Sequence, residues 1–524
     1  MVEMVKQTYR YSEAPIWELQ RAYYEQLGMK AWNNDQVPQY ITNSPMIATA
    51  YAETIFGLLQ DRAAQGELSE PVTIVELGAG AGRLAYHVLQ QLGELVAFAG
   101  IELPPYRYVI TDLPVSNVNG WRRHPALQPY VQQGLVDFAV FDAVNDTELK
   151  LVESGEVVRK GDLKQPVIVI ANYFFDGIPQ ELLYMGGGQV YECDIVMEYP
   201  KSYKELKPAE ALESLTLAYE HRRAPEYEDE SFAYRELISL YLEQADDSHI
   251  LFPSSGLSCL ERLNALSRSG FLLITADKGD HRLEDLQFAD PPQLVIHGSF
   301  SLTANYHALV HVFEQRGAEA LFTEHHYKNI NIGCILMLDK PKTYVNTRLA
   351  FRRFIERFGP DEFCSMKEWL DQQLDGITLQ PILAFWRLGG YDAEFFIQTA
   401  QRIVSLLPEA TDEELLDLRL GINKMWDSFY VMEQRYDLAL DAGLLLFEMN
   451  MYEEAKRFLD QSVQTDPEDP VPTVLYCLAI CSLELGLELE ARYYLGRALE
   501  LEPEHEEALA LLECLGEEQG EQDE

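Results

Sequence analysis

Basic residues are scarce in this chain. Its 524 residues include 41 Lys and Arg against 85 Asp and Glu, which gives a formal net charge of −44. So acidic a surface repels nucleic-acid phosphates and anionic lipids, and we therefore expect no nucleic-acid or membrane partner. The sequence also lacks an apolar run long enough to cross a bilayer, and its first residues have no apolar core of the signal-peptide type.

Cysteine is scarce as well. The seven cysteines form no C-x-x-C pair, and Cys477 and Cys481 have no His or Cys nearby that would complete a set of metal ligands. His307 and His311 have the i, i+4 spacing of a zinc pair, but the glutamate of the His-Glu-x-x-His motif is missing. We therefore predict no metal site and a reduced, cytoplasmic protein.

Hydrophobic residues, by contrast, make up 47% of the chain, which is typical of a folded protein. Continuous apolar segments alternate with helical ones over the first two thirds of the sequence. This pattern predicts an α/β fold whose sheet is mostly parallel and covered by helices on both faces. The predicted strands are residues 72–77, 108–111, 138–141, 167–171, 271–276 and 333–338.

The spacing of these segments also predicts the domains. The stretch between Ile170 and Phe271 is far longer than one crossover helix needs, which indicates an insertion into the sheet domain. A chain of this length is expected to form two or three domains. We predict a helical N-terminal segment (1–70), a sheet domain (71–342) with its insertion at about 181–265, a helical connector (343–430), a repeat region (431–516) and an acidic tail (517–524).

The repeat region contains two similar helical hairpins. Ala455 and Ala491 are 36 residues apart, and so are Pro467 and Pro503. Small residues and helix-ending prolines at matched positions resemble tetratricopeptide (TPR) repeats, and we expect the two copies to pack on neighbouring helices. The acidic tail carries no basic residue, so we expect it to be solvated and frayed.

A glycine-rich loop follows the first predicted strand directly. Gly78, Gly80 and Gly82 alternate with other residues, Glu76 precedes them, and a helix follows. Alternating glycines allow a sharp turn and a close approach to a ligand, while the helix offers its free N–H groups. The sequence pattern Glu-x-Gly-x-Gly-x-Gly differs from the Gly-x-Gly-x-x-Gly dinucleotide motif. It resembles the first motif of class I S-adenosylmethionine (SAM) methyltransferases.

Acidic residues follow the next two predicted strands. In an open parallel sheet the ligand lies across the carboxyl ends of the strands, so each strand end is a candidate position for a ligand-binding group. Asp112 could accept hydrogen bonds from ribose hydroxyls, and Asp142 from an adenine amino group. Glu102 is a weaker candidate for the ribose because two prolines follow it.

The fourth strand leads into Asn172-Tyr173-Phe174-Phe175-Asp176-Gly177-Ile178-Pro179. This segment resembles the Asn-Glu-(aromatic pair)-Asp-Ala-Leu-Pro pattern of the MidA-like SAM methyltransferases, which include the mitochondrial complex I assembly-factor arginine methyltransferase. Residues 22–28, 40–45, 270–280 and 298–309 resemble further segments of that family. The resemblance covers about residues 15–338 and leaves the helical C-terminal third outside.

The resemblance implies a Rossmann-like class I sheet with SAM as the cofactor. The residues expected to bind SAM are Glu76, Gly78, Gly80, Gly82, Asp112 and Asp142, and those expected to face the methyl group and the acceptor are Asn172, Tyr173 and Asp176. Tyr173 stands where the family has Glu, Lys278 where it has Tyr, and Asn305 where it has His. An arginine-modifying site needs a carboxylate to hold the guanidinium; Asp176 could supply it, or Tyr173 could line an aromatic substrate channel.

We therefore expect a SAM-dependent methyltransferase that acts on a protein acceptor, with arginine left open as the target and the TPR-like region aiding recognition of the partner. A catalytically altered SAM-binding scaffold or assembly factor is one alternative. A methyltransferase for a small molecule, in which the TPR-like region only forms a homodimer or other oligomer, is the second.

Overall fold

The computed structural model of the chain describes residues 4–32, 40–432, 436–465 and 470–522. The chain divides into two compact units, Met1–Glu368 and Trp369–Glu524. Pro467, one of the two repeat prolines, lies outside the described residues. Each unit is described separately below.

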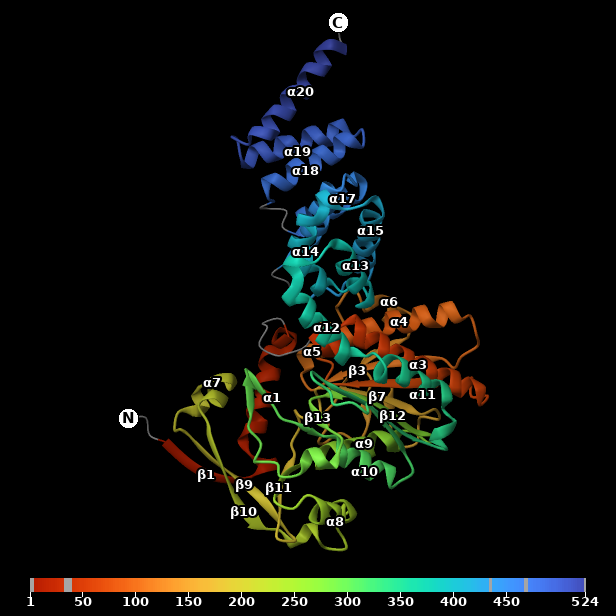
Figure 1. Cartoon of the computed structure of the whole chain (residues 1–524), viewed down its shortest axis with the longest axis vertical. Helices are drawn as coiled ribbons and strands as arrows, with labels where there is room; N and C mark the ends of the chain where they lie inside the picture. Colours follow the sequence, from red (N-terminus) through yellow and green to blue (C-terminus); the bar gives the residue numbers. More distant parts are fainter. Residues whose placement is uncertain (1–3, 33–39, 433–435, 466–469, 523–524) are drawn as a thin grey trace. The chain divides into compact units, whose positions relative to one another are not determined.

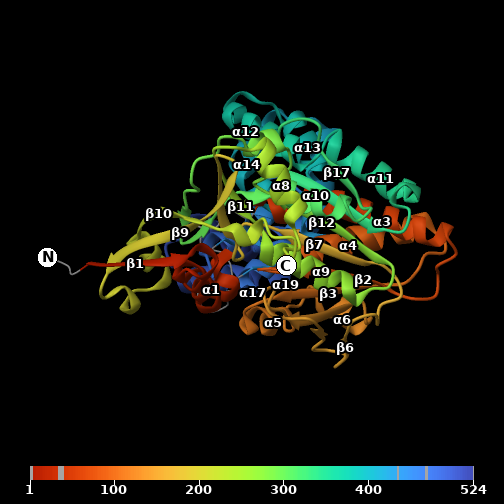
Figure 2. The ribbon, with the colours of Figure 1, turned by 90° about the horizontal axis from the view of Figure 1, so that it is seen from below.

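A seven-stranded sheet forms the core of the first unit, in the order β17-β18-β12-β7-β2-β3-β4. Its strands are β2 (Val72–Leu77), β3 (Tyr106–Asp112), β4 (Val136–Val140), β7 (Val167–Asn172), β12 (Gly270–Asp277), β17 (Glu319–Phe322) and β18 (Asn331–Leu338). Strands β12, β7, β2, β3 and β4 pair in parallel, whereas β18 is antiparallel to both β12 and β17. Figure 2 shows β12, β7, β2 and β3 side by side. The six predicted strands are present, and β17 was not predicted.

Helices cover both faces of this sheet. The connection from β2 to β3 through α4 (Arg83–Ala99) runs in the opposite direction along the sheet to the connection from β7 to β12 through α9 (Ser254–Leu266). Because such crossovers are right-handed, the two helices lie on opposite faces. The sheet thus lies between a layer with α3 (Pro45–Ala64) and α4 and a layer with α9 and α10 (Tyr306–Glu314) (Figure 1). The mixed α/β architecture that the sequence predicts is confirmed.

A second, antiparallel sheet lies in the insertion between β7 and β12. It contains β8 (Glu181–Gly186), β9 (Gln189–Pro200), β10 (Thr216–Arg223) and β11 (Ser248–Phe252), joined by the N-terminal strand β1 (Met4–Arg10) (Figure 1). The N-terminal segment, expected to be helical, therefore begins with a strand. Its residues alternate poorly between polar and apolar, but all seven pair with β9 in one antiparallel register, and this pairing supplies backbone hydrogen bonds that local propensity does not indicate.

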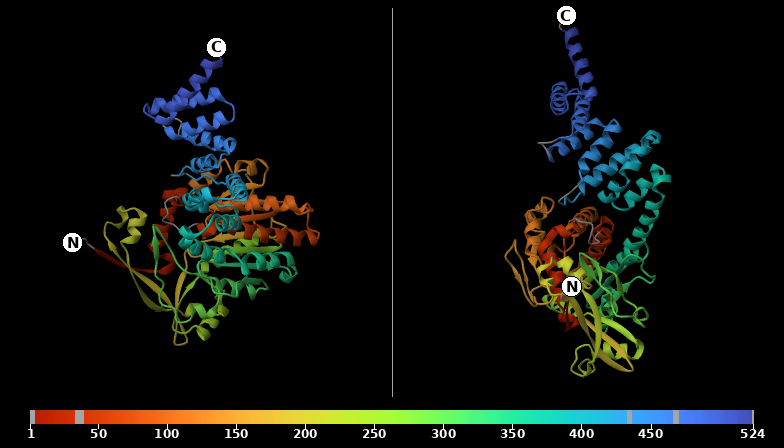
Figure 3. Two further views of the ribbon diagram at one scale, coloured as in Figure 1. Left: turned by 45° about the horizontal axis from the view of Figure 1, so that its top comes forward. Right: turned by 90° about the vertical axis from the view of Figure 1, so that its left-hand side faces the viewer.

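The elements after α12 (Pro360–Gln373) are helices throughout the described part of the chain (Figure 3). Helix α16 (Leu438–Glu448) packs against α17 (Tyr452–Thr465), and α18 (Pro472–Glu484) packs against α19 (Glu488–Leu501). Ala455 and Ala491 are fully buried in these pairs. The last described helix, α20, spans Glu506–Gln522, so residues 517–522 of the acidic segment expected to fray continue this helix. Among the described helices, none combines the length and the apolar character that a bilayer crossing requires.

Helix α3 is fixed closely to α11 (Val345–Phe351). The Asp61 carboxylate accepts four hydrogen bonds of 2.8–3.0 Å, from the backbone N–H groups and side chains of Asn346 and Thr347. One turn earlier, a Cβ atom placed on Gly57 would lie 2.8 Å from the backbone of Asn346. Glycine at position 57 therefore allows this helix end to approach.

We expect Gly57→Ala to lower the free energy of unfolding by about 1–3 kcal/mol, because the added methyl group meets backbone atoms that cannot rotate away. Gly93→Ala is the matched control, since Gly93 also lies inside a helix but has no atom within 4 Å of the added Cβ. There alanine should raise the free energy of unfolding by about 0.5–1 kcal/mol through its better helix propensity. Urea denaturation of both variants tests this prediction, and changes of the same sign would contradict it.

Candidate functional site

A cavity of about 420 Å³ opens at the carboxyl ends of the parallel strands. This is the edge of an open α/β sheet where ligands bind, near the point at which successive connections leave in opposite directions. Five of its lining residues come one from each strand end: Gly78, Asp112, Asp142, Tyr173 and Asp277. The N-terminal segment adds the aromatic side chains of Trp17, Tyr24 and Trp32.

The glycine loop turns sharply between β2 and α4. Gly78, Gly80 and Gly82 all have positive φ, at 62°, 56° and 78°, a conformation that other residues adopt only with strain. The indole of Trp32 lies where a side chain on Gly80 would be, 2.6 Å from the position of an added Cβ. Gly80 is thus covered by Trp32, while Gly78 lines the cavity.

Asp112 connects this loop to the end of β3. Its Oδ2 accepts from the backbone N–H of Gly80 at 3.0 Å and from Asn117 Nδ2 at 2.9 Å, and its Oδ1 accepts from the N–H of Leu113 at 2.8 Å. Burial raises the pKa of Asp112, and these hydrogen bonds counteract the rise. A carboxylate has about four acceptor positions, so three bonds leave one for a ligand hydroxyl in the cavity.

Asp142 is held in a similar way at the end of β4. Its carboxylate accepts from Arg21 Nη1 at 3.1 Å, from Asn145 Nδ2 at 3.1 Å and from the N–H of Val144 at 2.9 Å. Burial alone would raise the pKa of Asp142, but these donors outweigh it and lower the pKa below its usual value. Arg21 belongs to α1 (Pro15–Leu27), so this ion pair fastens the N-terminal segment to the sheet.

Four of the nine residues predicted for the site do not line the cavity. These are Glu76, Gly80, Gly82 and Asn172, whereas Gly78, Asp112, Asp142, Tyr173 and Asp176 line it. Glu76 accepts a 2.8 Å hydrogen bond from Tyr108, and burial raises its pKa to about 8. Asn172 accepts from the Tyr51 hydroxyl at 2.6 Å and donates to the carbonyl of Thr42 at 3.1 Å. Asn172 therefore fastens β7 to the N-terminal helices.

Tyr173 begins the turn after β7 in a strained conformation. Its φ of 46° lies in the left-handed region, which costs a bulky residue roughly 1–3 kcal/mol. Its backbone N–H donates to the carbonyl of Ala276 at 2.9 Å, so the neighbouring strand β12 helps to hold the turn. Burial, together with nearby Asp277 and Asp176, raises the pKa of the Tyr173 phenol, which therefore stays neutral.

Asp176 and Asp277 form a buried pair of carboxyl groups on the cavity wall. Their exposed fractions are 5% and 0%, and the two carboxyl groups lie close enough for each to affect the titration of the other. Burial raises the pKa of Asp176 to about 7 and raises that of Asp277, which also faces the charge of Asp176. Within the described residues, Asp176 Oδ1 and both Asp277 oxygens accept no well-aligned hydrogen bond from another group. The pair can thus hold one shared proton or bind a ligand that brings N–H donors.

Asp277 is not among the residues predicted for the site, although the segment around it resembles a family motif. The signal was the same as for Asp112: an acidic residue at the end of a predicted strand. Ala276 pairs in parallel with Asn172, so Asp277 reaches the cavity edge beside Tyr173. The contributions of Arg21 and Trp32 had no comparable signal, because they depend on how α1 and the following residues fold over the sheet.

Comparisons with known proteins add distant structural neighbours. No protein-family model matches the chain, and no curated protein matches it. A crystal structure of an uncharacterised protein from Burkholderia thailandensis is 17% identical, over 60% of this chain and 73% of that one, with a TM-score of 0.37. A second crystal structure from this organism is of a protein described as a candidate methyl transferase and bound to S-adenosyl-homocysteine. It is 16% identical, over 60% of this chain and 74% of that one, with a TM-score of 0.38. The CMeT domain of the citrinin polyketide synthase is 10% identical over 51% and 47%, with a TM-score of 0.24.

The carboxyl pair predicts how stability depends on pH. Because both pKa values are raised by folding, the unfolded chain releases these protons near pH 4, while the folded chain retains a shared proton to about pH 7. The folded state then holds more protons than the unfolded state, so the free energy of unfolding falls as the pH rises through this window.

Asp277→Asn removes one ionisable member of the pair and should flatten this dependence. Relative to the wild type, we expect the variant to gain about 1–3 kcal/mol of stability between pH 5 and pH 8, measured by urea denaturation at each pH. The exposed Asp339→Asn serves as the control and should leave the wild-type slope unchanged. Parallel curves for the wild type and Asp277→Asn would contradict the assignment of the pair.

Proposed function

We propose that the chain is a SAM-dependent methyltransferase whose cofactor lies in the cavity at the carboxyl ends of the strands. One observation supports the proposal most strongly. The glycine loop, Asp112 and Asp142 follow the ends of β2, β3 and β4, and they line the same cavity, the loop through Gly78. The parallel pairing of β12, β7, β2, β3 and β4 agrees with the Rossmann-like, mostly parallel sheet that the resemblance to class I methyltransferases implies.

The residues of this cavity fit such a cofactor. Gly78 lets the ligand approach the backbone closely, because no side chain intervenes. Asp112 has an acceptor position left for a ribose hydroxyl, and Asp142, held ionised by its donors, can accept from an adenine amino group. The acidic walls suit a ligand with a sulfonium and an ammonium group. The chemistry that the cofactor supplies when bound is an activated methyl group; the chain's own residues bind, orient and shield the reactants.

Asp176 and Asp277 are the residues that we propose to hold the acceptor. Two adjacent carboxyl groups can bind a guanidinium or amine through charge-assisted hydrogen bonds, and binding of a cation favours their ionised forms. A nitrogen that becomes methylated must lose a proton, and the ionised carboxylate of the pair is placed to accept it. The pair thus supplies the negative charge that Tyr173, in place of the family's Glu, does not.

The acceptor that we propose is a protein with an exposed basic side chain, arginine being the form that suits paired carboxylates best. Its recognition would be aided by the helical pairs of residues 431–516, if these bind peptides as TPR repeats do. A net charge of −44 favours basic partners. The cytoplasm is the compartment that we propose for this reaction.

A SAM-binding scaffold without turnover is the second candidate function. The observation that favours it is Tyr173, which occupies the place of the family's Glu in a strained left-handed turn. A bulky phenol at that place could close the acceptor side while leaving the glycine loop and Asp112 intact. The two experiments below separate binding from turnover.

Asp112→Ala should weaken the binding of SAM and of S-adenosylhomocysteine by about 1–3 kcal/mol. The substitution removes both the proposed charged hydrogen bond to the ribose and the hydrogen bond that Asp112 accepts from Gly80 of the glycine loop. Isothermal titration calorimetry with each ligand measures the change. Glu102→Gln is the control, since Glu102 is exposed and absent from the cavity wall, and it should bind as the wild type does. If Asp112→Ala binds normally, Asp112 does not hold the ribose.

Methyl-labelled SAM incubated with the full chain and a cell lysate should transfer its label to protein. Asp277→Asn should reduce the rate of labelling by about 10²–10⁴-fold if the pair accepts the proton, while binding of S-adenosylhomocysteine stays close to that of the wild type. Binding without any labelling would favour the scaffold, and label in the low-mass fraction would favour a small-molecule acceptor. If neither SAM nor S-adenosylhomocysteine binds, the methyltransferase proposal is refuted.

A further inference from the structure

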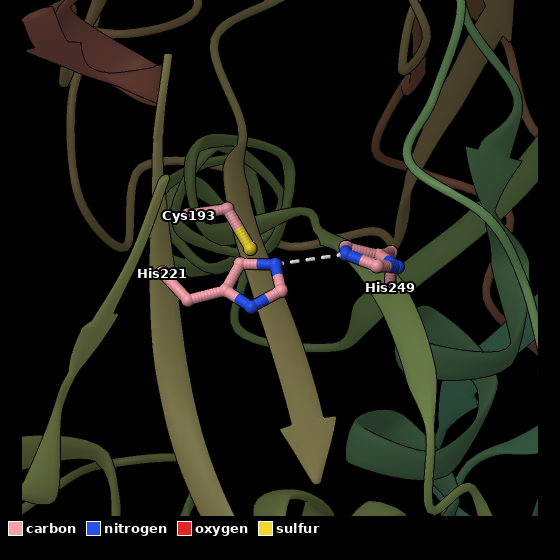
Figure 4. A group of neighbouring side chains, drawn as sticks. All are labelled: Cys193, His221 and His249. Carbon is pink, nitrogen blue, oxygen red and sulfur yellow. Dashed lines mark hydrogen bonds between the residues drawn. The ribbon is translucent and has the colours of Figure 1, made fainter. Parts of the chain in front are cut away.

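Three potential metal ligands meet on one face of the inserted antiparallel sheet. Cys193 lies on β9 and is the direct register partner of His221 on β10, while His249 lies on β11 (Figure 4). The Nε2 atoms of the two histidines are 3.0 Å apart. The Cys193 Sγ and one nitrogen of each imidazole all lie within 4.8 Å of one another.

This spacing is close to that of a tetrahedral metal site. Zinc binds imidazole nitrogen at about 2.0–2.1 Å and thiolate at about 2.3 Å, so two nitrogen ligands lie about 3.3–3.4 Å apart. Widening the His221–His249 separation by a few tenths of an ångström would admit the ion. Figure 4 shows the sulfur and the two rings turned toward a common point.

The surroundings orient one histidine as a ligand. His249 Nδ1 lies 3.1 Å from the carbonyl oxygen of Ala289, to which it can only donate, so its Nε2 carries the free lone pair. Metal-binding histidines commonly donate their second nitrogen to a carbonyl in this way, which fixes the tautomer and the ring. The ring of Tyr184 stacks on that of His221 at 4.4 Å, and its hydroxyl donates to Asp247 at 2.8 Å.

The site is also accessible from outside. Cys193 is buried, His249 is half-buried and His221 is exposed, so a fourth coordination position would face solvent. Burial raises the pKa of the Cys193 thiol to about 12, and a bound metal ion overcomes this by deprotonating its thiol ligand.

We propose that Cys193, His221 and His249 bind a divalent transition-metal ion of the zinc type. Thiolate and imidazole ligands together favour such ions over magnesium or calcium. On binding, Cys193 loses its proton to solvent, the proton of His221 moves from Nε2 to Nδ1, and the His249 tautomer is unchanged, so one proton is released per ion. The ion would link β10 to β11, two strands that among the described residues pair with β9 and β8, respectively, and not with each other.

A second group of potential ligands does not share these properties. His325, Asp361 and Glu362 also lie within 4.8 Å of one another. However, the Asp361 carboxylate already accepts from the backbone N–H groups of Lys328, Asn329 and Ile330 at 2.6–3.0 Å. That carboxylate caps a turn, and the group offers no thiolate.

Cobalt(II) is the probe for the proposed site, because thiolate coordination gives it a charge-transfer absorption that carboxylate and imidazole ligands lack. We expect the full-length, tag-free, reduced chain, stripped with a chelator, to bind one cobalt ion with this absorption, and zinc to abolish the absorption by competition. Cys193→Ser should remove the absorption, and His221→Gln and His249→Gln should each weaken cobalt binding at least about tenfold. His221 is exposed, so its substitution leaves the core intact.

Cys259→Ser is the matched control, since Cys259 is equally buried but belongs to no metal-ligand group among the described residues. It should retain both the absorption and the affinity. Absence of the thiolate absorption with cobalt in excess would overturn the proposal. So would an absorption that survives Cys193→Ser, or cobalt binding that His221→Gln and His249→Gln leave unchanged.

Discussion

The pairing of β2 with β7 on one side and β3 on the other is the constraint on which the candidate site depends. Both pairings are parallel, so the carboxyl ends of the three strands emerge at the same edge of the sheet. The connections that leave β2 and β7 lead in opposite directions, and this separation opens space above the sheet. The glycine loop, Asp112 and Tyr173 are far apart in sequence and meet because of this topology alone.

Parallel strands that end at one edge of the sheet bury acidic groups, which is electrostatically unfavourable. The chain stabilises these groups in two ways. Glu76 is buried within β2 and accepts a hydrogen bond from Tyr108; burial raises its pKa to about 8, so it carries little charge at neutral pH. Asp142 is held ionised by donors that include Arg21. An acidic residue near a strand end can therefore be a neutral structural group or a charged binding group. The number of donors around it decides which of the two applies.

The sequence predicted the sheet better than it predicted the wall of the cavity. The core strands were found because they are short, continuously apolar and separated by helices, which is what burial on both faces requires. Strands β1 and β10 carry mixed polar residues and owe their existence to pairing with β9, so local pattern could not reveal them. Glu76 and Asn172 were assigned to the site because they flank a strand end. Neither lines the cavity; their side chains bond to Tyr108, Tyr51 and Thr42 instead, and only the fold shows this.

Long-range groupings escaped prediction for the same reason. Cys193, His221 and His249 are spaced evenly along the chain but lie in no local motif, since antiparallel register rather than helical spacing brings them together. Asp277 had a readable signal, an acidic residue closing a strand, yet its importance depends on Asp176 lying beside it. The role of an acidic residue at a strand end therefore depends on which residues lie at the end of the adjacent strand. The order of the strands in the sheet determines those neighbours.

Two pairs of aspartates that line the cavity differ in how completely their oxygens are hydrogen-bonded. Asp112 and Asp142 each accept three hydrogen bonds from the protein, which fixes their positions before any ligand arrives. Asp176 and Asp277 instead have oxygens for which the described part of the chain supplies no well-aligned donor, beside the strained turn of Tyr173. Unsatisfied buried carboxyls and backbone strain persist in a folded protein only when the surrounding structure holds them in place. The satisfied pair suits the cofactor of the proposed methyltransferase, because its position is fixed before the ligand binds. The other pair gains most from a ligand that brings its own N–H donors. This difference is the physical basis for proposing that Asp112 and Asp142 bind the cofactor and that Asp176 and Asp277 bind the acceptor.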